Sequence, residues 1–351
     1  MKNNLFFVST VYQLFAAIAI RISVCSEESA TLVLSSDTPL FAKLYEQHSC
    51  TSTFDKVIYF ENRCLPSNKI RTAVDYAYNS FNNKRIVKKY FGNEQFSDIY
   101  FFNPHFLFQA CFMSFNGQAR FHSIDDGMIC YLRSTIPVGK KHPYRSLVSF
   151  LSNTPQLKDL SYDCYLFNPN FYIGADNHTL VCIPCVNKEN RLLHSAICSC
   201  FLHLPKDIEE RYIFFEEAED LCLDPKTTRF LVSQIAQIVG YDNFVLKRHP
   251  RNKGRYQDTN IRIMDTSAPW EVICLTTDMS SRCMLSFSST ASLSSKVIMG
   301  GNEKVILLYE LLDRKYKVYY ESGFSKYIQA LASNCHNIHI PKSFSELKTL
   351  L

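Results

Sequence analysis

Ile99-Tyr-Phe-Phe102, an apolar run at residues 105–113 and Ala119-Arg-Phe-His-Ser-Ile124 follow one another directly before Asp125-Asp126-Gly127. The two outer runs are short and rich in aromatic and apolar residues, which is typical of strands. The run between them is long enough for a helix. A strand, a helix and a second strand predict a parallel βαβ unit, which places the Asp-Asp-Gly tripeptide at the carboxyl end of a strand.

The same alternation extends back to the amino terminus. Three earlier apolar runs are read as strands, each followed by a segment of helical period, and Asp37 is expected to cap the second helix. Regular alternation of strands and helices predicts an α/β domain with a parallel sheet and helices on both faces. The expected strands are 5–9, 31–35 and 57–60, and the expected helices begin at Thr10 and cover 39–48 and 68–90.

A second alternating block follows a less regular, proline-containing segment at 133–205. We therefore predict two Rossmann-like doubly wound domains, residues 1–205 and residues 206–351, with ligands bound in a cleft that the two domains face. The last two helices, at 324–332 and 343–351, are expected to pack back on the first domain. The other expected elements of the second block are strands at 212–215, 244–247, 284–287, 297–299 and 305–309 and helices at 226–239 and 269–275.

The composition excludes several classes of protein. The chain has 351 residues, of which 46% are hydrophobic, so it can bury a sizeable core. A net charge of +5 is too weak to indicate nucleic-acid binding. The sequence has only 10 glycines and neither a Gly-x-Gly-x-x-Gly nor a Walker A motif, which argues against dehydrogenases and P-loop enzymes.

The apolar run from Leu5 to Ile20 resembles a signal peptide only in part, since Tyr12 and Gln13 interrupt it and no cleavage site of small residues follows. We read it as a buried strand and helix, and expect a cytoplasmic protein that contacts a membrane at most peripherally. The 14 cysteines are expected to be free thiols in that compartment. The cluster Cys182, Cys185, His194, Cys198 and Cys200 lacks regular zinc spacing and is read as small buried residues, not as a metal site.

Three polar segments follow predicted strands. They are Asp125-Asp126-Gly127, Lys247-Arg-His249-Pro250-Arg251 and Ser288-Ser289-Thr290. Each has a purely structural interpretation, as a turn, a common dipeptide or a helix cap. A cap is also an anion site, however, because free backbone amides and hydroxyls point at incoming negative charge. Together the His-Pro and Ser-Thr segments suggest a phosphate pocket, and the Asp pair suggests a base.

In order and spacing, these three motifs resemble those of the bacterial sialyltransferases of glycosyltransferase family 52, the lipooligosaccharide sialyltransferases. The likeness includes the strand–helix–strand run into Asp-Asp-Gly and extends more weakly to about residue 300. It implies a GT-B fold, an inverting transfer of sialic acid from CMP-sialic acid and no metal requirement. The implied acceptor is a galactose-terminated oligosaccharide or glycolipid of lipooligosaccharide or capsule, and the implied assembly includes a homodimer.

The resemblance also implies roles for individual residues. Asp126 is the first choice for the base, with Glu217 and Glu219 as rivals after the first strand of the second, CMP-binding domain. His249 would protonate or hydrogen-bond the leaving phosphate, which Ser288 and Ser289 would hold. The remaining motif residues, which would line the site, are Asp125, Gly127, Pro250, Arg251 and Thr290. Two alternatives stay open: a GT-B transferase with another nucleotide sugar, and a non-catalytic glycan-binding or assembly protein of the same fold.

Overall fold

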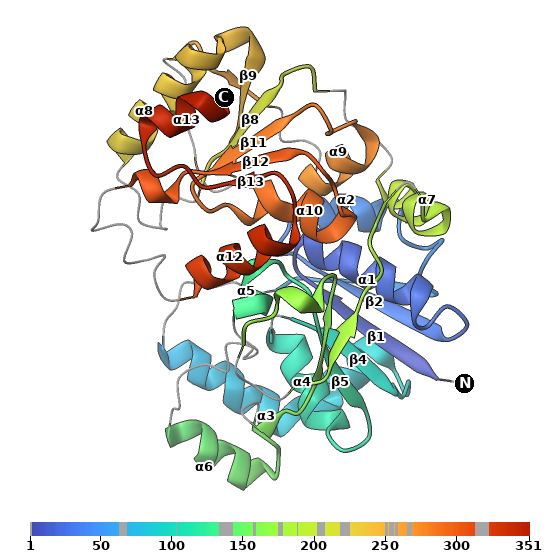
Figure 1. Ribbon diagram of the computed structural model, residues 1–351. Coiled ribbons are helices and arrows are strands. Elements are labelled where there is room, and N and C mark those ends of the chain that lie inside the picture. The colour runs from blue at the N-terminus through green and yellow to red at the C-terminus, as the bar shows by residue number, and fades with distance from the viewer. Residues whose placement is uncertain are drawn as a thin grey trace. The chain divides into compact units, whose positions relative to one another are not determined.

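The chain forms two compact α/β units (Figure 1). The expected boundary between residues 205 and 206 lies outside the described residues. The first unit holds Met1–Pro169, Gly174–Pro184 and Arg191–Leu202, and the second holds Asn170–Ile173, Cys185–Asn190 and His203–Leu351. The computed structural model describes residues 2–62, 69–102, 104–132, 143–156, 159–174, 178–187, 189–201, 208–217, 225–249, 252, 256, 259–264, 269–312 and 323–351.

The first unit is built on a parallel seven-stranded sheet with the order β3-β2-β1-β4-β5-β6-β7. The segment that was expected to be less regular contributes its last two strands. The strands are β1 (Asn3–Val8), β2 (Ser29–Ser35), β3 (Lys56–Phe60), β4 (Asp98–Phe101), β5 (Arg120–Ile124), β6 (Asp163–Leu166) and β7 (Leu180–Cys182).

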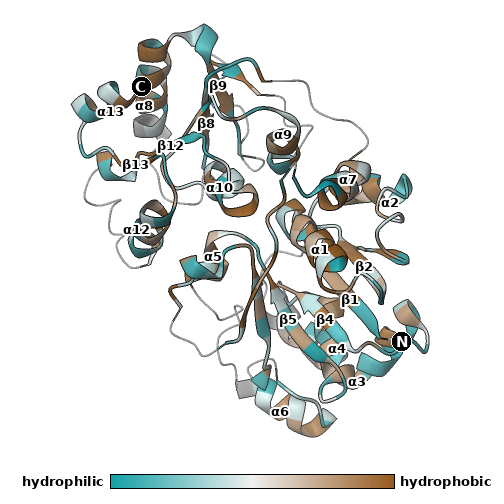
Figure 2. Cartoon of the chain, turned by 45° about the vertical axis from the view of Figure 1, so that its right-hand side comes forward, coloured by the Kyte–Doolittle hydropathy of each residue, from teal (hydrophilic) through white to brown (hydrophobic). Residues whose placement is uncertain are grey.

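Helices cover this sheet on both faces. Those of the first unit are α1 (Val11–Ser23), α2 (Leu40–Glu46), α3 (Lys69–Phe91), α4 (Phe106–Phe115), α5 (Met128–Leu132), α6 (Pro143–Ser152) and α7 (Arg191–Cys200). Helix α3 packs against both α4 and α6, while α1 packs against α7. Most of α1 is brown in Figure 2 because most of its residues are hydrophobic, and its residues from Tyr12 to Ile20 are all buried. The amino-terminal apolar run is therefore core, as expected.

Two of these helices, α1 and α2, start differently: α1 has a side-chain cap and α2 has none. The Thr10 hydroxyl accepts from the Gln13 amide at 3.2 Å and starts α1 as predicted. The Asp37 prediction was wrong, because α2 begins without a side-chain cap. Asp37 instead accepts from the Ser35 hydroxyl at 2.7 Å and from the Asn62 amide at 3.1 Å, which ties the end of β2 to the end of β3.

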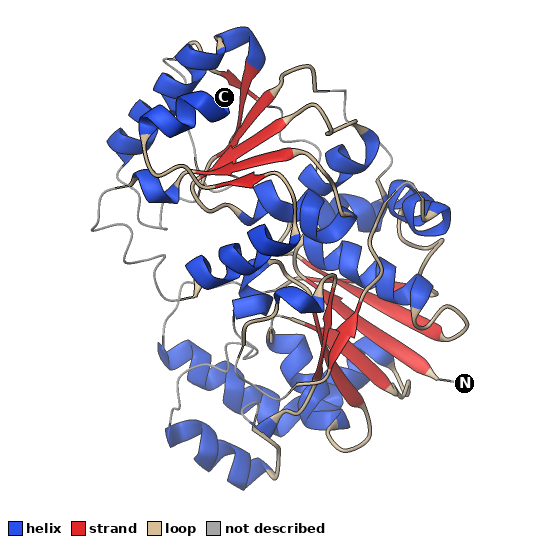
Figure 3. Cartoon of the chain, viewed as in Figure 1, coloured by secondary structure: helices blue, strands red, loops and turns tan. Residues whose placement is uncertain are grey.

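The second unit has a parallel six-stranded sheet with the order β10-β9-β8-β11-β12-β13 (Figure 3). The predicted strand at 297–299 is wrong, because these residues end helix α10. The elements are β8 (Tyr212–Phe215), β9 (Phe244–Lys247), β10 (Arg262–Ile263), β11 (Cys283–Ser286), β12 (Lys304–Leu307), β13 (Ile338–His339), α8 (Pro225–Val239), α9 (Trp270–Thr276), α10 (Ser294–Met299), α12 (Phe324–Asn334) and α13 (Phe344–Leu350).

The carboxyl-terminal helix packs on the second sheet. Leu347 of α13 is fully buried, Lys304 of β12 donates to the Leu350 carbonyl at 3.0 Å, and the Tyr212 hydroxyl of β8 donates to the Leu351 carbonyl. Among the described helices, none combines the length and the apolar character that crossing a membrane requires.

Each sheet has one place where the chain order reverses direction. In the first sheet it lies between β1 and β4, and in the second between β8 and β11. Ligands of open parallel sheets bind outside the carboxyl ends of the strands at such switch points. The polar residues that follow β1, β5, β8, β9 and β11 therefore lie at the carboxyl edges where ligands are expected to bind.

Candidate functional site

In the turn after β5 the two aspartates point in different directions. Asp125 is fully buried, and its carboxylate accepts from the Gly127 amide at 2.8 Å, the Phe167 amide at 3.1 Å and the Tyr131 hydroxyl. Gly127 has a φ of 83°, a backbone conformation that favours glycine. Asp125 and Gly127 thus shape the turn, and the structural interpretation accounts for both.

Asp126 is the member of the pair that faces another strand end. The Thr10 hydroxyl, directly after β1, donates to Asp126 Oδ1 at 2.8 Å. Burial raises the pKa of Asp126 to about 6, and the Thr10 and Gln13 side chains partly offset this effect. A carboxylate with a pKa near neutrality suits a general base, because it is ionised at working pH yet basic enough to accept a proton.

In the second unit, polar residues gather where β8, β9 and β11 end. β8 lies between the other two strands, so the segments that follow β8, β9 and β11 are neighbours at the carboxyl edge of the second sheet. Glu216 and Glu217 directly follow β8 and are both buried, at 2% and 9% exposure. Buried carboxylates need partners, and these two find them on the adjoining strand ends.

Glu217 links the end of β8 to Ser288, which follows β11. Its Oε1 atom accepts from the Ser288 hydroxyl at 2.6 Å and also from the Ser288 amide. Its backbone carbonyl accepts from the Asn252 side chain at 2.6 Å. Because Ser288 directs its proton at Glu217, this carboxylate fixes the orientation of the hydroxyl.

Glu216 joins the same strand to the His-Pro segment. Its Oε2 atom accepts from the His249 amide at 3.1 Å, and the Asn252 amide donates to the His249 carbonyl at 3.0 Å. The backbone around His249 is thus held on both sides, while its side chain is half-buried. The predicted site residues Glu219, Pro250 and Arg251 lie outside the described residues.

Ser289 and Thr290 stand at the start of a short 3-10 turn, Thr290–Leu293, that leads into α10. Within the described part of the chain, the Ser289 side chain makes no capping hydrogen bond to this turn. Both residues are half-buried. The helix-cap interpretation therefore does not account for the Ser289 hydroxyl, which stays a candidate ligand group.

The cysteine cluster does not form a metal site. The described residues contain no group of three or more histidine, cysteine or acidic side chains placed to hold a metal ion. Cys182 and Cys185 are exposed, contrary to the expectation of burial, whereas Cys200 is buried. Cys198 contacts His194 one helical turn away in α7, at 3.8 Å. The cysteines in the described ranges are free thiols, as expected.

The comparisons with known proteins concern the fold. No family model and no curated protein matches the sequence. Solved structures do match. The glycotransferase of kitacinnamycin has a TM-score of 0.54 and 10% identity, with 99% of this chain and 89% of that chain covered. CalG4, the calicheamicin glycosyltransferase, has a TM-score of 0.54 and 11% identity, with 99% and 88% covered. LpCGTa in complex with UDP has a TM-score of 0.53 and 9% identity, with 97% and 84% covered.

The chain has the GT-B fold. The predicted α/β class with two Rossmann-like units is confirmed. At these identities the likeness speaks for the fold alone, so the sialyltransferase resemblance stays a prediction that rests on the three motifs.

Sequence reasoning missed several residues of the two GT-B units. Thr10 was expected only to begin a helix, yet its hydroxyl also donates to Asp126. Asn252 and Glu216, which fix the backbone of the His-Pro segment, carry no motif of their own. Both are buried polar residues within five positions of a strand end, and a sequence alone does not reveal that burial.

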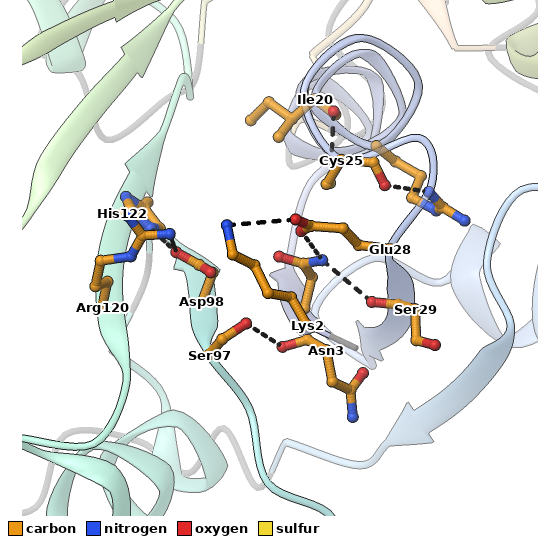
Figure 4. Close-up of polar contacts among 12 residues, drawn as sticks. Lys2, Asn3, Ile20, Cys25, Glu28, Ser29, Ser97, Asp98, Arg120 and His122 are labelled. Atoms are coloured by element: carbon orange, nitrogen blue, oxygen red, sulfur yellow. Dashed lines mark hydrogen bonds and ion pairs between the residues drawn. The ribbon is translucent and has the colours of Figure 1, made fainter.

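A second polar cluster lies at the opposite, amino edge of the first sheet (Figure 4). Asp98 accepts from Arg120 at 2.7 Å and pairs with His122 at 2.8 Å. Burial opposes ionisation of Asp98, but hydrogen bonds from His122, Arg120 and Ser97 outweigh it and lower its pKa to about 2. Because ligands bind at the carboxyl edge, we assign this cluster to stability and not to chemistry.

Proposed function

We propose that this GT-B chain is a glycosyltransferase that moves a sugar from a nucleotide-activated donor to a hydroxyl group of a glycan acceptor. One observation carries the proposal. The polar residues after β8, β9 and β11 are linked by hydrogen bonds at the carboxyl edge of the second sheet, beside its switch point. The GT-B neighbours, which include named glycosyltransferases, support the same reaction class.

In this proposal the second unit binds the donor phosphate. His249 donates to, or protonates, the leaving phosphate oxygen, and the Ser289 and Thr290 hydroxyls bind it. Arg251, from the same motif, would add positive charge, and it lies with Pro250 outside the described residues. Glu217 is a positioning residue here, because it accepts from both the hydroxyl and the amide of Ser288 and so holds the start of the segment that carries Ser289 and Thr290.

The first unit supplies the base. Asp126 takes the proton of the acceptor hydroxyl as its oxygen attacks the anomeric carbon of the donor. The bond from that carbon to the phosphate oxygen breaks, and the electron pair leaves with the phosphate. The anomeric configuration inverts because a single displacement occurs. The pKa of about 6 and the Thr10 hydrogen bond support this role for Asp126.

Two donor classes follow from different observations. LpCGTa was solved with UDP, which favours a UDP-sugar as the first donor to test. The order Asp-Asp-Gly, His-Pro and Ser-Ser favours CMP-sialic acid, with a galactose-terminated glycolipid or oligosaccharide as acceptor at the inner face of the cytoplasmic membrane. A glycan-binding protein without activity would bind a nucleotide and never release one from a sugar.

A donor screen tests the proposal. Purified protein is mixed with UDP-sugars and with CMP-sialic acid, with and without a galactose-terminated acceptor, and the release of UDP, UMP or CMP is scored. We expect release from one donor class, stimulated by acceptor and persisting in EDTA, since none of the three motifs contains Asp-x-Asp. Binding of a nucleotide without release from any donor would favour the non-catalytic alternative, and loss in EDTA with recovery in Mg²⁺ would refute the metal-independent mechanism.

A further inference from the structure

The helix α6 exposes an apolar face. Leu147, Phe150 and Leu151 are exposed by 59%, 82% and 63%. Their spacing of three and four residues places them on one side of the helix. Isolated exposed apolar side chains are ordinary, but three large ones on a single helical turn form a contiguous patch that indicates an interaction site.

The opposite face of α6 is anchored on α3. Ser149 is buried, and its hydroxyl lies 2.7 Å from the Tyr76 hydroxyl. The Tyr144 ring meets the Tyr76 ring edge to face at 6.4 Å, and the Arg145 guanidinium lies 5.4 Å from the same ring. The fold therefore holds α6 through its polar side and leaves the apolar side outward.

The neighbouring helix α3 carries a second exposed stripe. Val74, Tyr78 and Phe81 are exposed by 59%, 52% and 60% and follow the spacing i, i+4, i+7. Arg85 and Lys88 continue the same stripe and are exposed. Figure 2 shows α6 and α3 together at one end of the first unit. The exposed surface of the two helices thus joins apolar side chains to a basic end.

We propose that the outer faces of α6 and α3 bind the surface of an anionic phospholipid membrane. Such a surface accepts apolar side chains at the boundary between head groups and acyl chains, and its negative potential attracts arginine and lysine. Charge favours anionic lipid as the partner of this surface, because the basic residues at positions 84, 85, 88 and 89 of α3 are exposed. The basic residues at 140–142, which precede α6, lie outside the described residues. The proposal does not depend on glycosyl transfer.

Vesicle sedimentation tests the proposal. The purified chain is mixed with vesicles of phosphatidylcholine alone, or of phosphatidylcholine with phosphatidylglycerol, at low and high salt. We expect binding to the anionic vesicles that weakens with salt. Phe150→Ser lowers the partition coefficient about tenfold, because the phenyl ring no longer enters the membrane. Lys88→Glu lowers it about fivefold.

The matched control is Phe230→Ser on α8, which removes a phenylalanine that is exposed by 62% in the second unit. This variant should bind vesicles as the parent does, and all three variants should keep the thermal unfolding midpoint, since the residues are exposed. Equal vesicle binding by the parent and Phe150→Ser overturns the proposal. So does a self-associated parent that Phe150→Ser converts to monomer, because the patch would then be an interface between copies of the chain.

Discussion

The Thr10 hydroxyl donates a hydrogen bond to Asp126 across 2.8 Å, which links the end of β1 to the end of β5 although β4 lies between these strands. The same hydroxyl accepts a hydrogen bond from the Gln13 amide in the first turn of α1, while it donates its own proton to the carboxylate of Asp126. This contact separates Asp126 from its neighbour Asp125, whose partners lie in its own turn, in α5 and in the segment after β6. It is the reason that we assign the base to Asp126.

The rate of transfer should fall as the pH falls through about 6, because protonated Asp126 cannot accept the proton of the acceptor. Thr10→Val removes a hydrogen bond that favours the ionised carboxylate, so the acidic limb of the pH–rate profile should move to higher pH. Thr10→Ser keeps the hydroxyl and should keep the limb in place. Identical profiles for all three proteins would show that Asp126 does not control the rate.

Two neutral substitutions should have opposite effects on stability. Since burial raises the pKa of Asp126 to about 6, its contribution to stability is complete below the unfolded pKa and is lost as the pH rises through about 6. At neutral pH Asp126→Asn should therefore leave the free energy of unfolding equal or raise it by about 1–2 kcal/mol.

Burial raises the pKa of Asp125 to about 6 as well, so the contrast between the two variants rests on their hydrogen-bond partners. Both oxygens of Asp125 accept from backbone amides, so in Asp125→Asn the new side-chain amide would face a donor such as the Phe167 amide and leave it unpaired. We expect a loss of about 1–3 kcal/mol. Urea denaturation at neutral pH measures both variants. A large loss of stability in Asp126→Asn, equal to that in Asp125→Asn, would mean that both aspartates are structural.

Apolar runs were sufficient to predict most strands, because central strands of a parallel sheet are buried on both faces and leave a continuous hydrophobic signature. The same rule misplaced Val297–Met299, since a short apolar run does not distinguish a strand from a buried helix. Here Gly300, with a φ of 67°, ends helix α10. The two-residue strands β10 and β13 are too short to leave a pattern. The motif positions were predictable, but the contacts that separate Asp126 from Asp125 are tertiary.

Glu217 and Ser288 should behave as one unit. Glu217→Gln weakens the hydrogen bond that orients the Ser288 hydroxyl, and Ser288→Ala removes the hydroxyl itself. Each should lower kcat/KM for the donor about tenfold, on the scale of a lost hydrogen bond to a charged group. The double variant should have a kcat/KM no lower than that of the less active single variant. A double-mutant cycle of donor kinetics measures this coupling. Strictly additive losses would mean that Glu217 acts independently of Ser288.

The cluster around Asp98 predicts resistance to acid. Because the pKa of Asp98 is lowered to about 2, its contribution to stability is complete above the unfolded pKa and is lost as the pH falls through about 2. At neutral pH Asp98→Asn should lower the free energy of unfolding by roughly 2 kcal/mol. Asp163→Asn is the control, since Asp163 lies 3.5 Å from the other side of His122 and is more exposed. Equal effects in urea denaturation would contradict this account of Asp98.

In the proposed glycosyl transfer Asp126 acts as the base and His249 assists the leaving phosphate, and nucleotide release from the donor tests these two roles most directly. The measurement compares the parent chain with Asp126→Asn and His249→Ala, with and without acceptor, beside the affinity of each for the free nucleotide. We predict that acceptor-dependent release collapses in Asp126→Asn while nucleotide affinity is kept. His249→Ala should lower kcat by roughly 10²–10⁴-fold, with a modest loss of affinity. Near-parental release in both variants would contradict the assignment of the site.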